Sequence, residues 1–174
     1  HWNFQIVKGV LMKLSINPEL KRLSPSNFWH ILATGFGSGL SPKAPGTAGS
    51  LAAVPFCYLL GLASLPLKAT IIVVAFAIGV YACQKATDAI GIDDHGGIVW
   101  DEFVGMFITV ACLPNTLAWL IAGFVVFRIF DIWKPWPIGP IDAKLKGGLG
   151  IMLDDVIAGV FALVVLKLIE VTFF

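Results

Sequence analysis

The sequence predicts an all-α fold: a helical integral membrane domain of about five apolar helices plus short N-terminal helices, with an acidic site at the cytoplasmic membrane face. Three observations predict it. Hydrophobic residue types make up 57% of the 174 residues and charged types only 13%, about half the charged share of an ordinary soluble domain. Five apolar runs follow one another along the chain. Most acidic residues gather near the ends of these runs.

Two regions are expected along the chain. Residues 1–26 form an N-terminal interfacial segment and linker, and residues 27–174 form a single helical domain. Four apolar residues near the start recur at the spacing of a short helix that lies in the membrane interface: Phe4, Val7, Leu11 and Leu14. An unstructured leader is an equally good interpretation of this stretch.

Glycine and proline mark the next part of the chain. Residues 27–34 are apolar but too few to cross a membrane. Residues 35–50 contain five glycines and two prolines, which exclude a regular helix there.

The five apolar runs are predicted to be helices. They cover residues 50–66, 69–83, 98–113, 117–133 and 151–169. Most of them reach roughly 22–27 Å at the helical rise per residue, slightly less than a hydrocarbon core about 30 Å thick. Each is therefore a marginal span, and a compact helical domain that is only partly immersed is the alternative. The short connections at Pro66 and Pro114 favour tight helical hairpins.

Positive charges predict the orientation of this multi-pass domain. If the helices alternate in direction, the N-terminal region and the long connections 84–97 and 134–150 share one side of the membrane. That side carries Lys8, Lys13, Lys21, Arg22, Lys43, Lys85, Lys134, Lys144 and Lys146, and the exceptions are Lys68 and Lys167. Because such residues mark the cytoplasmic side, we expect it to face the cytoplasm. A net charge of +1 argues against a nucleic-acid partner.

The acidic residues converge in this topology. Eight of the eleven fall in four places at the cytoplasmic face: Asp88, Asp93 and Asp94; Asp101 and Glu102; Asp131; Asp154 and Asp155. An ionised side chain within a membrane helix costs about 2.5–3.5 kcal/mol. Helix dipoles stabilise single acids at helix starts, but that alternative does not explain adjacent pairs, which repel unless a cation or a base balances them.

Clustered carboxylates without a cysteine or histidine cluster are typical of Mg²⁺ sites, with Mn²⁺ as the alternative ion. The predicted metal ligands are Asp101, Glu102, Asp131, Asp154 and Asp155. Mg²⁺ held by a few carboxylates usually acts on a phosphate. The residues alone therefore predict a metal site for a phosphorylated group at the membrane surface.

Groups that bind phosphate occur nearby. Arg128, Asp131 and Lys134 recur every three residues and would form one stripe on a helix, where arginine and lysine can hold a phosphate. A ladder of salt bridges within the helix is the alternative. The glycine-rich segment, where Thr47 to Ser50 lead into the first long helix, can present backbone N–H groups to an anion. Its alternative is tight helix packing.

His95 stands beside Asp94 in an acidic loop. It can shuttle a proton or orient a neighbour by hydrogen bonding. If the site hydrolyses a phosphate, the group that takes the proton from the attacking water is either His95 or a carboxylate. Direct attack by a carboxylate, which would form an acyl phosphate, is a second possible mechanism.

Four long motifs in one order resemble the phosphatidylglycerophosphatase A family over nearly the whole chain. They read WHILATGFGSGLSPKAPGTAGSLAAVPF, DDHGGIVWDEFVGM, FVVFRIFDIWKPWPI and GGLGIMLDDVIAGV. The resemblance implies a bacterial inner-membrane enzyme that hydrolyses phosphatidylglycerol phosphate to phosphatidylglycerol and inorganic phosphate with Mg²⁺ during phospholipid biosynthesis. The family also looks similar to soluble all-helical relatives, which keeps the partly immersed architecture open.

The family's characteristic residues correspond to positions in this sequence. Its acids match Asp94, Asp101, Glu102, Asp131, Asp154 and Asp155, and its basic and glycine-rich positions match Arg128, Lys134, Gly46, Thr47 and Ser50. The candidate catalytic residues are Asp94, His95, Asp101, Glu102 and Asp131. The candidate phosphate-binding residues are Arg128, Lys134, Gly46, Thr47 and Ser50.

The alternative function is a small cation-coupled membrane transporter, which would also place acids in membrane helices. Such a protein tends to carry charges at the membrane midplane and repeat symmetry, and this sequence has acids at run ends and no evident repeat. The CDP-alcohol phosphotransferase signature DGxxAR and the lipid-phosphatase signature PSGH are both absent. The sequence predicts no oligomeric state.

Overall fold

The computed structural model describes residues 17–173, and within this range the chain is all helical, with seven α-helices and no strand. The elements are η1 (Pro18–Arg22), α2 (Phe28–Ala33), η2 (Ser38–Leu40), α3 (Pro45–Gly61), α4 (Leu65–Ile90), α5 (Trp100–Val110), α6 (Leu117–Trp133), α7 (Ile138–Lys144) and α8 (Gly147–Phe173). The predicted all-α class is confirmed. The predicted interfacial helix over the first 14 residues lies outside the described residues.

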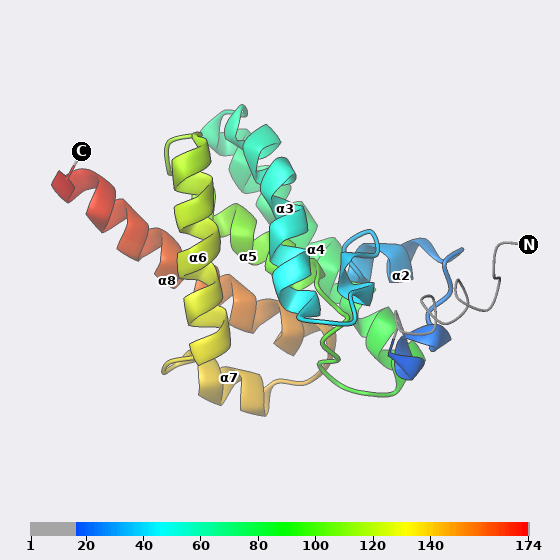
Figure 1. The fold of residues 1–174 in the computed structure, drawn as a ribbon. Coiled ribbons are helices and arrows are strands. Elements are labelled where there is room, and N and C mark those ends of the chain that lie inside the picture. Colours follow the sequence, from blue (N-terminus) through cyan, green and yellow to red (C-terminus); the bar gives the residue numbers. More distant parts are fainter. Residues whose placement is uncertain (1–16, 174) are drawn as a thin grey trace, which may run out of the picture.

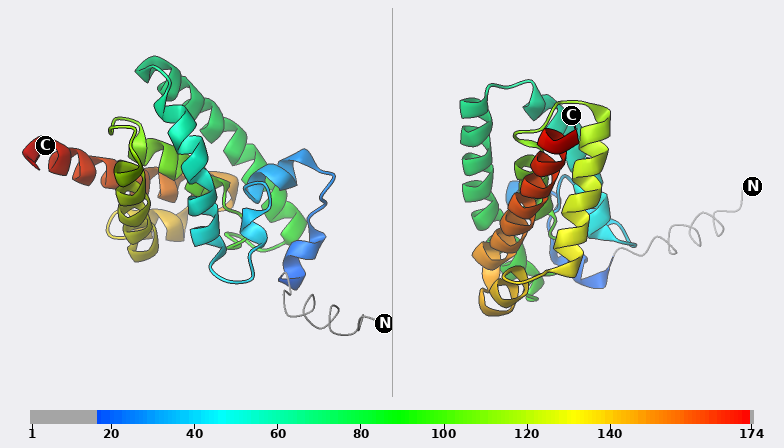
Figure 2. Two further views of the ribbon diagram at one scale, coloured as in Figure 1. Left: turned by 45° about the horizontal axis from the view of Figure 1, so that its top comes forward. Right: turned by 90° about the vertical axis from the view of Figure 1, so that its left-hand side faces the viewer.

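Helix α5 is the centre of the fold. It packs against α3, α4, α6 and α8, and each of its residues except Ile108 is buried. Trp100 at its start donates a 3.0 Å hydrogen bond from Nε1 to the carbonyl of Ala75 in α4. Phe103 and Met106 on α5 and Phe127 on α6 are among the largest fully buried side chains. Helix α8 packs against four helices, α4 to α7, and its C-terminal half projects beyond the others (Figures 1 and 2).

The helix bounds correct three expectations. Helix α3 begins at Pro45, so a regular helix occupies the end of the segment 35–50; proline suits a first helical turn, where its missing N–H needs no partner. Helix α4 continues through the start of the connection 84–97 and ends at Ile90, before Gly91, whose φ is +77°. The connection 134–150 contains α7 and the first turn of α8. In contrast, α6 spans the predicted run 117–133.

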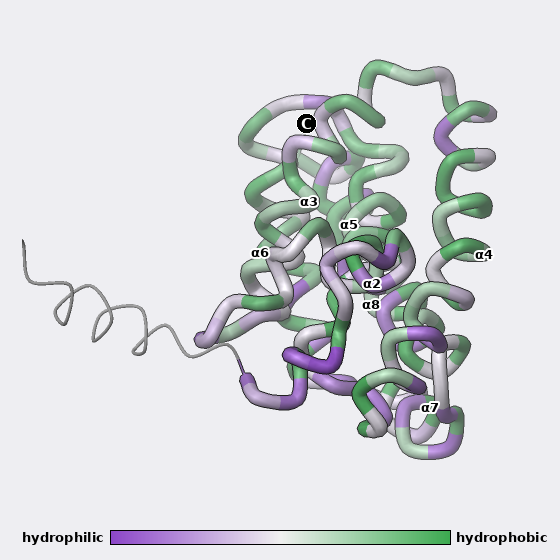
Figure 3. The backbone as a smooth tube through the Cα atoms, turned by 90° about the vertical axis from the view of Figure 1, so that its right-hand side faces the viewer, coloured by the Kyte–Doolittle hydropathy of each residue, from purple (hydrophilic) through white to green (hydrophobic). Residues whose placement is uncertain are grey.

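Only two of these helices are long and apolar enough to cross a membrane by length and composition: α4 with 26 residues and α8 with 27. Their most apolar windows are only 17% and 22% buried inside the protein, whereas α5 has 11 residues and lies in the core. Each predicted apolar run overlaps a helix, but the expectation of about five membrane helices is not confirmed. Hydrophilic positions gather at the end of the molecule where α7 lies (Figure 3).

The segment before α2 is anchored to the rest of the protein. Leu20 is buried in the core, and Arg22 donates a 2.5 Å hydrogen bond from Nη1 to the carbonyl of Ile90 at the end of α4. Glu19 Oε2 lies 3.0 Å from Nε2 of His95. The residues predicted to be a polar linker are thus tied to the loop between α4 and α5. The division into regions 1–26 and 27–174 stays a prediction.

Candidate active site

Five carboxylates from three helices meet in one place. Asp101, Asp154 and Asp155 can each offer an oxygen atom within 4.8 Å of the others. Glu102, Asp131 and Asp155 form a second such group. The acids are separated by up to 54 positions in the sequence, from Asp101 to Asp155. They come from the first turn of α5, the last turn of α6 and the N-terminal third of α8. The predicted convergence of these five acids is therefore present in the structure.

The close packing of α5 and α8 brings the acids together. A Cβ atom added to Gly159 would lie 2.5 Å from the carbonyl oxygen of Gly105, and one added to Gly105 would lie 3.0 Å from the carbonyl of Asp155. Thr109 Oγ1 also donates hydrogen bonds to the carbonyls of Gly105 and Gly159. The two backbones thus cross in contact, one turn away from the acidic pairs.

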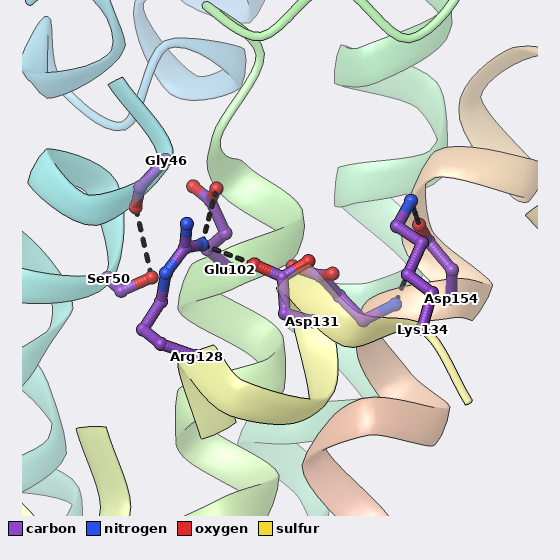
Figure 4. Close-up of polar contacts among 8 residues, drawn as sticks. Gly46, Ser50, Glu102, Arg128, Asp131, Lys134 and Asp154 are labelled. Carbon is purple, nitrogen blue, oxygen red and sulfur yellow. Dashed lines mark hydrogen bonds and ion pairs between the residues drawn. The ribbon is translucent and has the colours of Figure 1, made fainter. Parts of the chain in front are cut away.

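Two basic side chains balance part of this charge. Arg128 Nη1 donates to Oε1 of Glu102 at 3.3 Å and to Oδ2 of Asp131. Lys134 Nζ lies 2.8 Å from Oδ2 of Asp154 and 3.1 Å from Oδ1 of Asp142. Figure 4 shows the contacts of Arg128 beside those of Lys134, with Arg128 between Glu102 and the start of α3, where Gly46 and Ser50 are labelled.

Lys134 corrects the predicted stripe on one helix. Helix α6 ends at Trp133, and Lys134 follows in a left-handed conformation with φ +45°. Its side chain therefore pairs across to α8 and α7 and does not continue the row of Arg128 and Asp131. The alternative of an intrahelical salt-bridge ladder holds for Arg128 and Asp131 only.

Several buried polar atoms of this site have no partner among the described residues. They are Asp101 Oδ1, Glu102 Oε2, Asp155 Oδ2 and Arg128 Nε. Buried charged groups without partners are costly, and buried polar atoms nearly always have a hydrogen-bond partner. Three unpaired carboxylate oxygens in one cluster are the donor set that a hard divalent cation prefers.

Burial and mutual repulsion disfavour the charged form of the acids on α5. Burial raises the pKa of Asp101 well above its usual value, and the negative charges of Asp154 and Asp131 add to the effect. Burial and then Asp101 and Asp131 raise the pKa of Glu102, with Arg128 opposing them. A bound cation would reverse this balance and keep the carboxylates ionised.

The start of α3, beside the acids, has backbone N–H groups without an acceptor among the described residues. Its cap residue Ala44 makes no side-chain hydrogen bond to the helix, and no acceptor among the described residues takes the N–H of Gly46 or Thr47. Gly46 lies against Glu102 Oε1 and the guanidinium of Arg128. Ser50 donates its hydroxyl to the carbonyl of Gly46 at 3.0 Å, so its hydrogen is used within α3. The free amides at a helix start attract an anion.

Asp94 and His95 lie at different edges of the site. Asp94 has φ +50° and lines a polar cavity of about 290 Å³ together with Asp93, Asp142 and Lys146. Partial burial raises the pKa of Asp94, against the opposing charge of Lys134.

His95 bonds away from the acids. Its Nε2 contacts Asn17 and Glu19, and its Nδ1 accepts from the N–H of Gly97. The structure thus joins His95 to the N-terminal segment and shows no polar contact between it and the five carboxylates.

Sequence reasoning missed Asp142 and Gln84, and it placed Asp93 at this face without giving it a partner. Asp142 on α7 pairs with Lys134. Asp93 accepts from the N–H of Gly147, and Gln84 accepts from the N–H of Gly148, which satisfies the start of α8. The signal for Asp142 was weak, because its only cue is that it lies eight positions after Lys134 in the same connection.

The lysine that links these groups has a shifted pKa. Burial acts to lower the pKa of Lys134, but hydrogen bonds and charges of Asp154 and Asp142 outweigh it and raise that pKa above its usual value. Lys134 is therefore charged at neutral pH.

Comparisons with known proteins agree on one family. A sequence model of phosphatidylglycerophosphatase A matches residues 31–170. The protein of Escherichia coli K12 named phosphatidylglycerophosphatase A is 54% identical over 142 residues, which cover 81% of this chain and 83% of that protein. The one of Haemophilus influenzae is 49% identical over 157 residues, or 88% and 96% of the two chains.

A third relative carries another name. A Bacteroides thetaiotaomicron protein named "Putative phosphatidylinositol-3-phosphatase" is 39% identical over 150 residues, which cover 82% of this chain and 93% of that protein. No solved structure matches the chain.

Proposed function

This chain belongs to the phosphatidylglycerophosphatase A family, and we propose that it hydrolyses phosphatidylglycerol phosphate to phosphatidylglycerol and inorganic phosphate with Mg²⁺, as a step of phospholipid biosynthesis. It is a phosphatase. The observation that carries the proposal is the cluster of five carboxylates with three unpaired buried oxygens, placed beside Arg128 and the free amides of α3. Nothing in the comparisons supports the transporter alternative.

The residues that would hold Mg²⁺ are Asp101, Glu102, Asp131, Asp154 and Asp155. When bound, the ion would polarise the phosphate and lower the pKa of a water molecule. Arg128 would donate hydrogen bonds to the terminal phosphate, and the N–H groups of Gly46 and Thr47 would receive its other oxygens. These donors are fixed before the substrate arrives, because α3 and α6 both pack against α5 or its acids.

The proton of the attacking water would pass to one of the carboxylates of the site, which the bound ion keeps ionised and therefore able to accept it. Asp94 at the rim and His95 beyond it stay candidates for later proton transfer. Lys134, held by Asp154 and Asp142, would add positive charge at the edge of the site. Attack by a carboxylate would instead form and then hydrolyse an acyl phosphate.

The position of the site suits a lipid substrate. Helices α4 and α8 expose apolar side chains such as Val73 and Val171, and large exposed apolar faces mark contact with a membrane or a partner. We place these helices in the bacterial inner membrane as part of a multi-pass domain, with the acidic site at its cytoplasmic face. The acyl chains would then stay in the bilayer while the glycerol phosphate reaches the carboxylates.

The proposal is tested by phosphate release from lipid phosphates presented in detergent micelles. We expect release from phosphatidylglycerol phosphate, loss of release in EDTA, and recovery on adding excess Mg²⁺. Phosphatidylinositol 3-phosphate is the matched competing substrate, because one relative is named for it. Faster turnover of that lipid would contradict the proposed substrate, and turnover unaffected by EDTA would contradict the metal.

Arg128→Ala tests the phosphate-binding role. We expect kcat/KM to fall about 10²–10³-fold, the usual cost of removing one preorganised donor to a developing oxyanion. Steady-state kinetics and thermal melting of the same preparation distinguish a role of Arg128 in phosphate binding from a role in stability alone. Arg22→Ala is the matched control, because Arg22 bonds to the end of α4 and not to the acids. A lower melting temperature with unchanged kinetics of the folded fraction would show that Arg128 is only structural.

A further inference from the structure

We propose that the acidic site holds two divalent cations, and that Asp155 is the ligand they share. The inference rests on the proposed Mg²⁺-dependent function and adds the number of ions and the role of each carboxylate.

The geometry contains two ligand groups. Asp101 and Asp154 each offer an oxygen within 4.8 Å of Asp155, and Glu102 and Asp131 do so independently. Asp155 alone belongs to both groups. Three carboxylates around each ion leave positions open for water and phosphate oxygens, which is how Mg²⁺ is usually held in enzymes that act on phosphates.

The unpaired oxygens are divided between the two groups. Asp101 Oδ1 belongs to the first, Glu102 Oε2 to the second, and Asp155 Oδ2 to the shared residue. These three residues are 7%, 7% and 2% exposed, so water does not solvate their side chains freely. A single ion in either group would leave an unpaired buried carboxylate oxygen in the other, which is costly.

Each group also has its own basic side chain. Arg128 pairs with Glu102 and Asp131, and Lys134 pairs with Asp154. One basic side chain thus lies beside each ligand group, and neither Arg128 nor Lys134 pairs with Asp155.

The charge balance favours the second ion. Six carboxylates, counting Asp142 beside Lys134, face one arginine and one lysine, which leaves four negative charges. One divalent ion would leave the site negative, and a negative site repels a phosphate monoester. A second ion neutralises the site, and two-metal sites of this kind stabilise both the attacking and the leaving oxygen of a phosphoryl group.

The number of ions can be measured without substrate. The purified protein is dialysed against Mn²⁺, and the bound manganese is measured by elemental analysis and electron paramagnetic resonance. We expect two Mn²⁺ per chain and the spectrum of an exchange-coupled pair, because a shared carboxylate couples neighbouring Mn²⁺ ions. One Mn²⁺ per chain at saturation, or two with only uncoupled spectra, overturns the inference.

Variants assign the two groups. Asp131→Asn and Asp154→Asn should each leave one Mn²⁺ per chain and remove the coupled spectrum. Asp142→Asn is the matched control: Asp142 also pairs with Lys134 but belongs to neither ligand group, so this variant should keep two coupled ions. Thermal melting confirms that each variant is folded, and the wild-type spectrum tests the proposal even if a variant is not. Two coupled ions in both Asp131→Asn and Asp154→Asn would overturn it.

These outcomes separate the inference from the proposed function. If the wild-type protein binds one Mn²⁺ and still releases phosphate in a chelator-sensitive way, the two-ion site is wrong and the lipid phosphatase stands. If it binds two coupled ions and hydrolyses no phosphatidylglycerol phosphate, the proposed substrate is wrong and the two-ion site stands.

Discussion

Replacing Asp155 with asparagine should lower phosphate release by about 10³-fold. Asp155 is the one residue common to both ligand groups, and its Oδ2 atom is buried without a partner. An amide is a poorer ligand for Mg²⁺ than a carboxylate, because it lacks the negative charge. Metal ions contribute several kcal/mol to stabilisation of the transition state, and about 4 kcal/mol corresponds to this loss of rate.

The same substitution should stabilise the metal-free protein. In EDTA, the buried carboxylate of Asp155 faces Asp101, Glu102 and Asp154 without a cation, and the amide removes that repulsion. We expect a gain of about 1–2 kcal/mol, or a rise in melting temperature of roughly 2–8 °C for a chain of this size. With Mg²⁺ the order should reverse, because only the wild type gains stability from ion binding.

Melting curves with EDTA and with Mg²⁺, together with phosphate release at saturating Mg²⁺, measure both effects. Asp88→Asn is a matched control: Asp88 is a carboxylate on α4 that bonds to Gln84 and belongs to neither ligand group. Near-wild-type turnover by folded Asp155→Asn would remove the metal site from the account. Lower stability of this variant in EDTA would show that Asp155 has a structural partner instead.

The acidic site was predictable because its charged residues occur within apolar sequence, where a charge is costly. Adjacent acids such as Asp154 and Asp155 interrupt an apolar run, and no property of a single helix explains them. If successive apolar helices alternate in direction, Asp154 and Asp155 lie on the same side of the domain as Asp101 and Glu102. The ends of α6 were also predictable, because Thr116 caps its start and prolines follow Lys134.

The depth of each helix was not predictable. A run buried by protein and a run covered by lipid have the same hydropathy, so the sequence could not distinguish the core helix α5 from the exposed α4 and α8. Contacts between distant parts of the chain determine where Lys134 and His95 lie. Lys134 follows α6 in a left-handed conformation and pairs with Asp154, and His95 pairs with Glu19 and not with the acids of the site. Both partners are far away in the sequence, so no local sequence pattern predicts these contacts.

Replacing Gly159 with alanine should cost both stability and activity, although this residue is not one of the proposed metal ligands. The new Cβ would lie 2.5 Å from the carbonyl oxygen of Gly105 and 3.2 Å from its Cα, closer than backbone atoms allow. Because the obstacle is main chain, α5 and α8 must separate. Overpacking of this kind costs about 1–3 kcal/mol, or roughly 2–12 °C in melting temperature.

Separation of these helices also moves Asp155 relative to Asp101 and Glu102, and a displacement of about 1 Å can cost roughly 10²-fold in rate. Melting temperature and kcat of the folded protein measure the two effects. Gly96→Ala makes the same chemical change where the Cβ would meet only Pro45, at 3.7 Å, and should leave both unchanged. If Gly159→Ala has the melting temperature and kcat of the wild type, the close packing of the α5 and α8 backbones is not what positions the metal ligands.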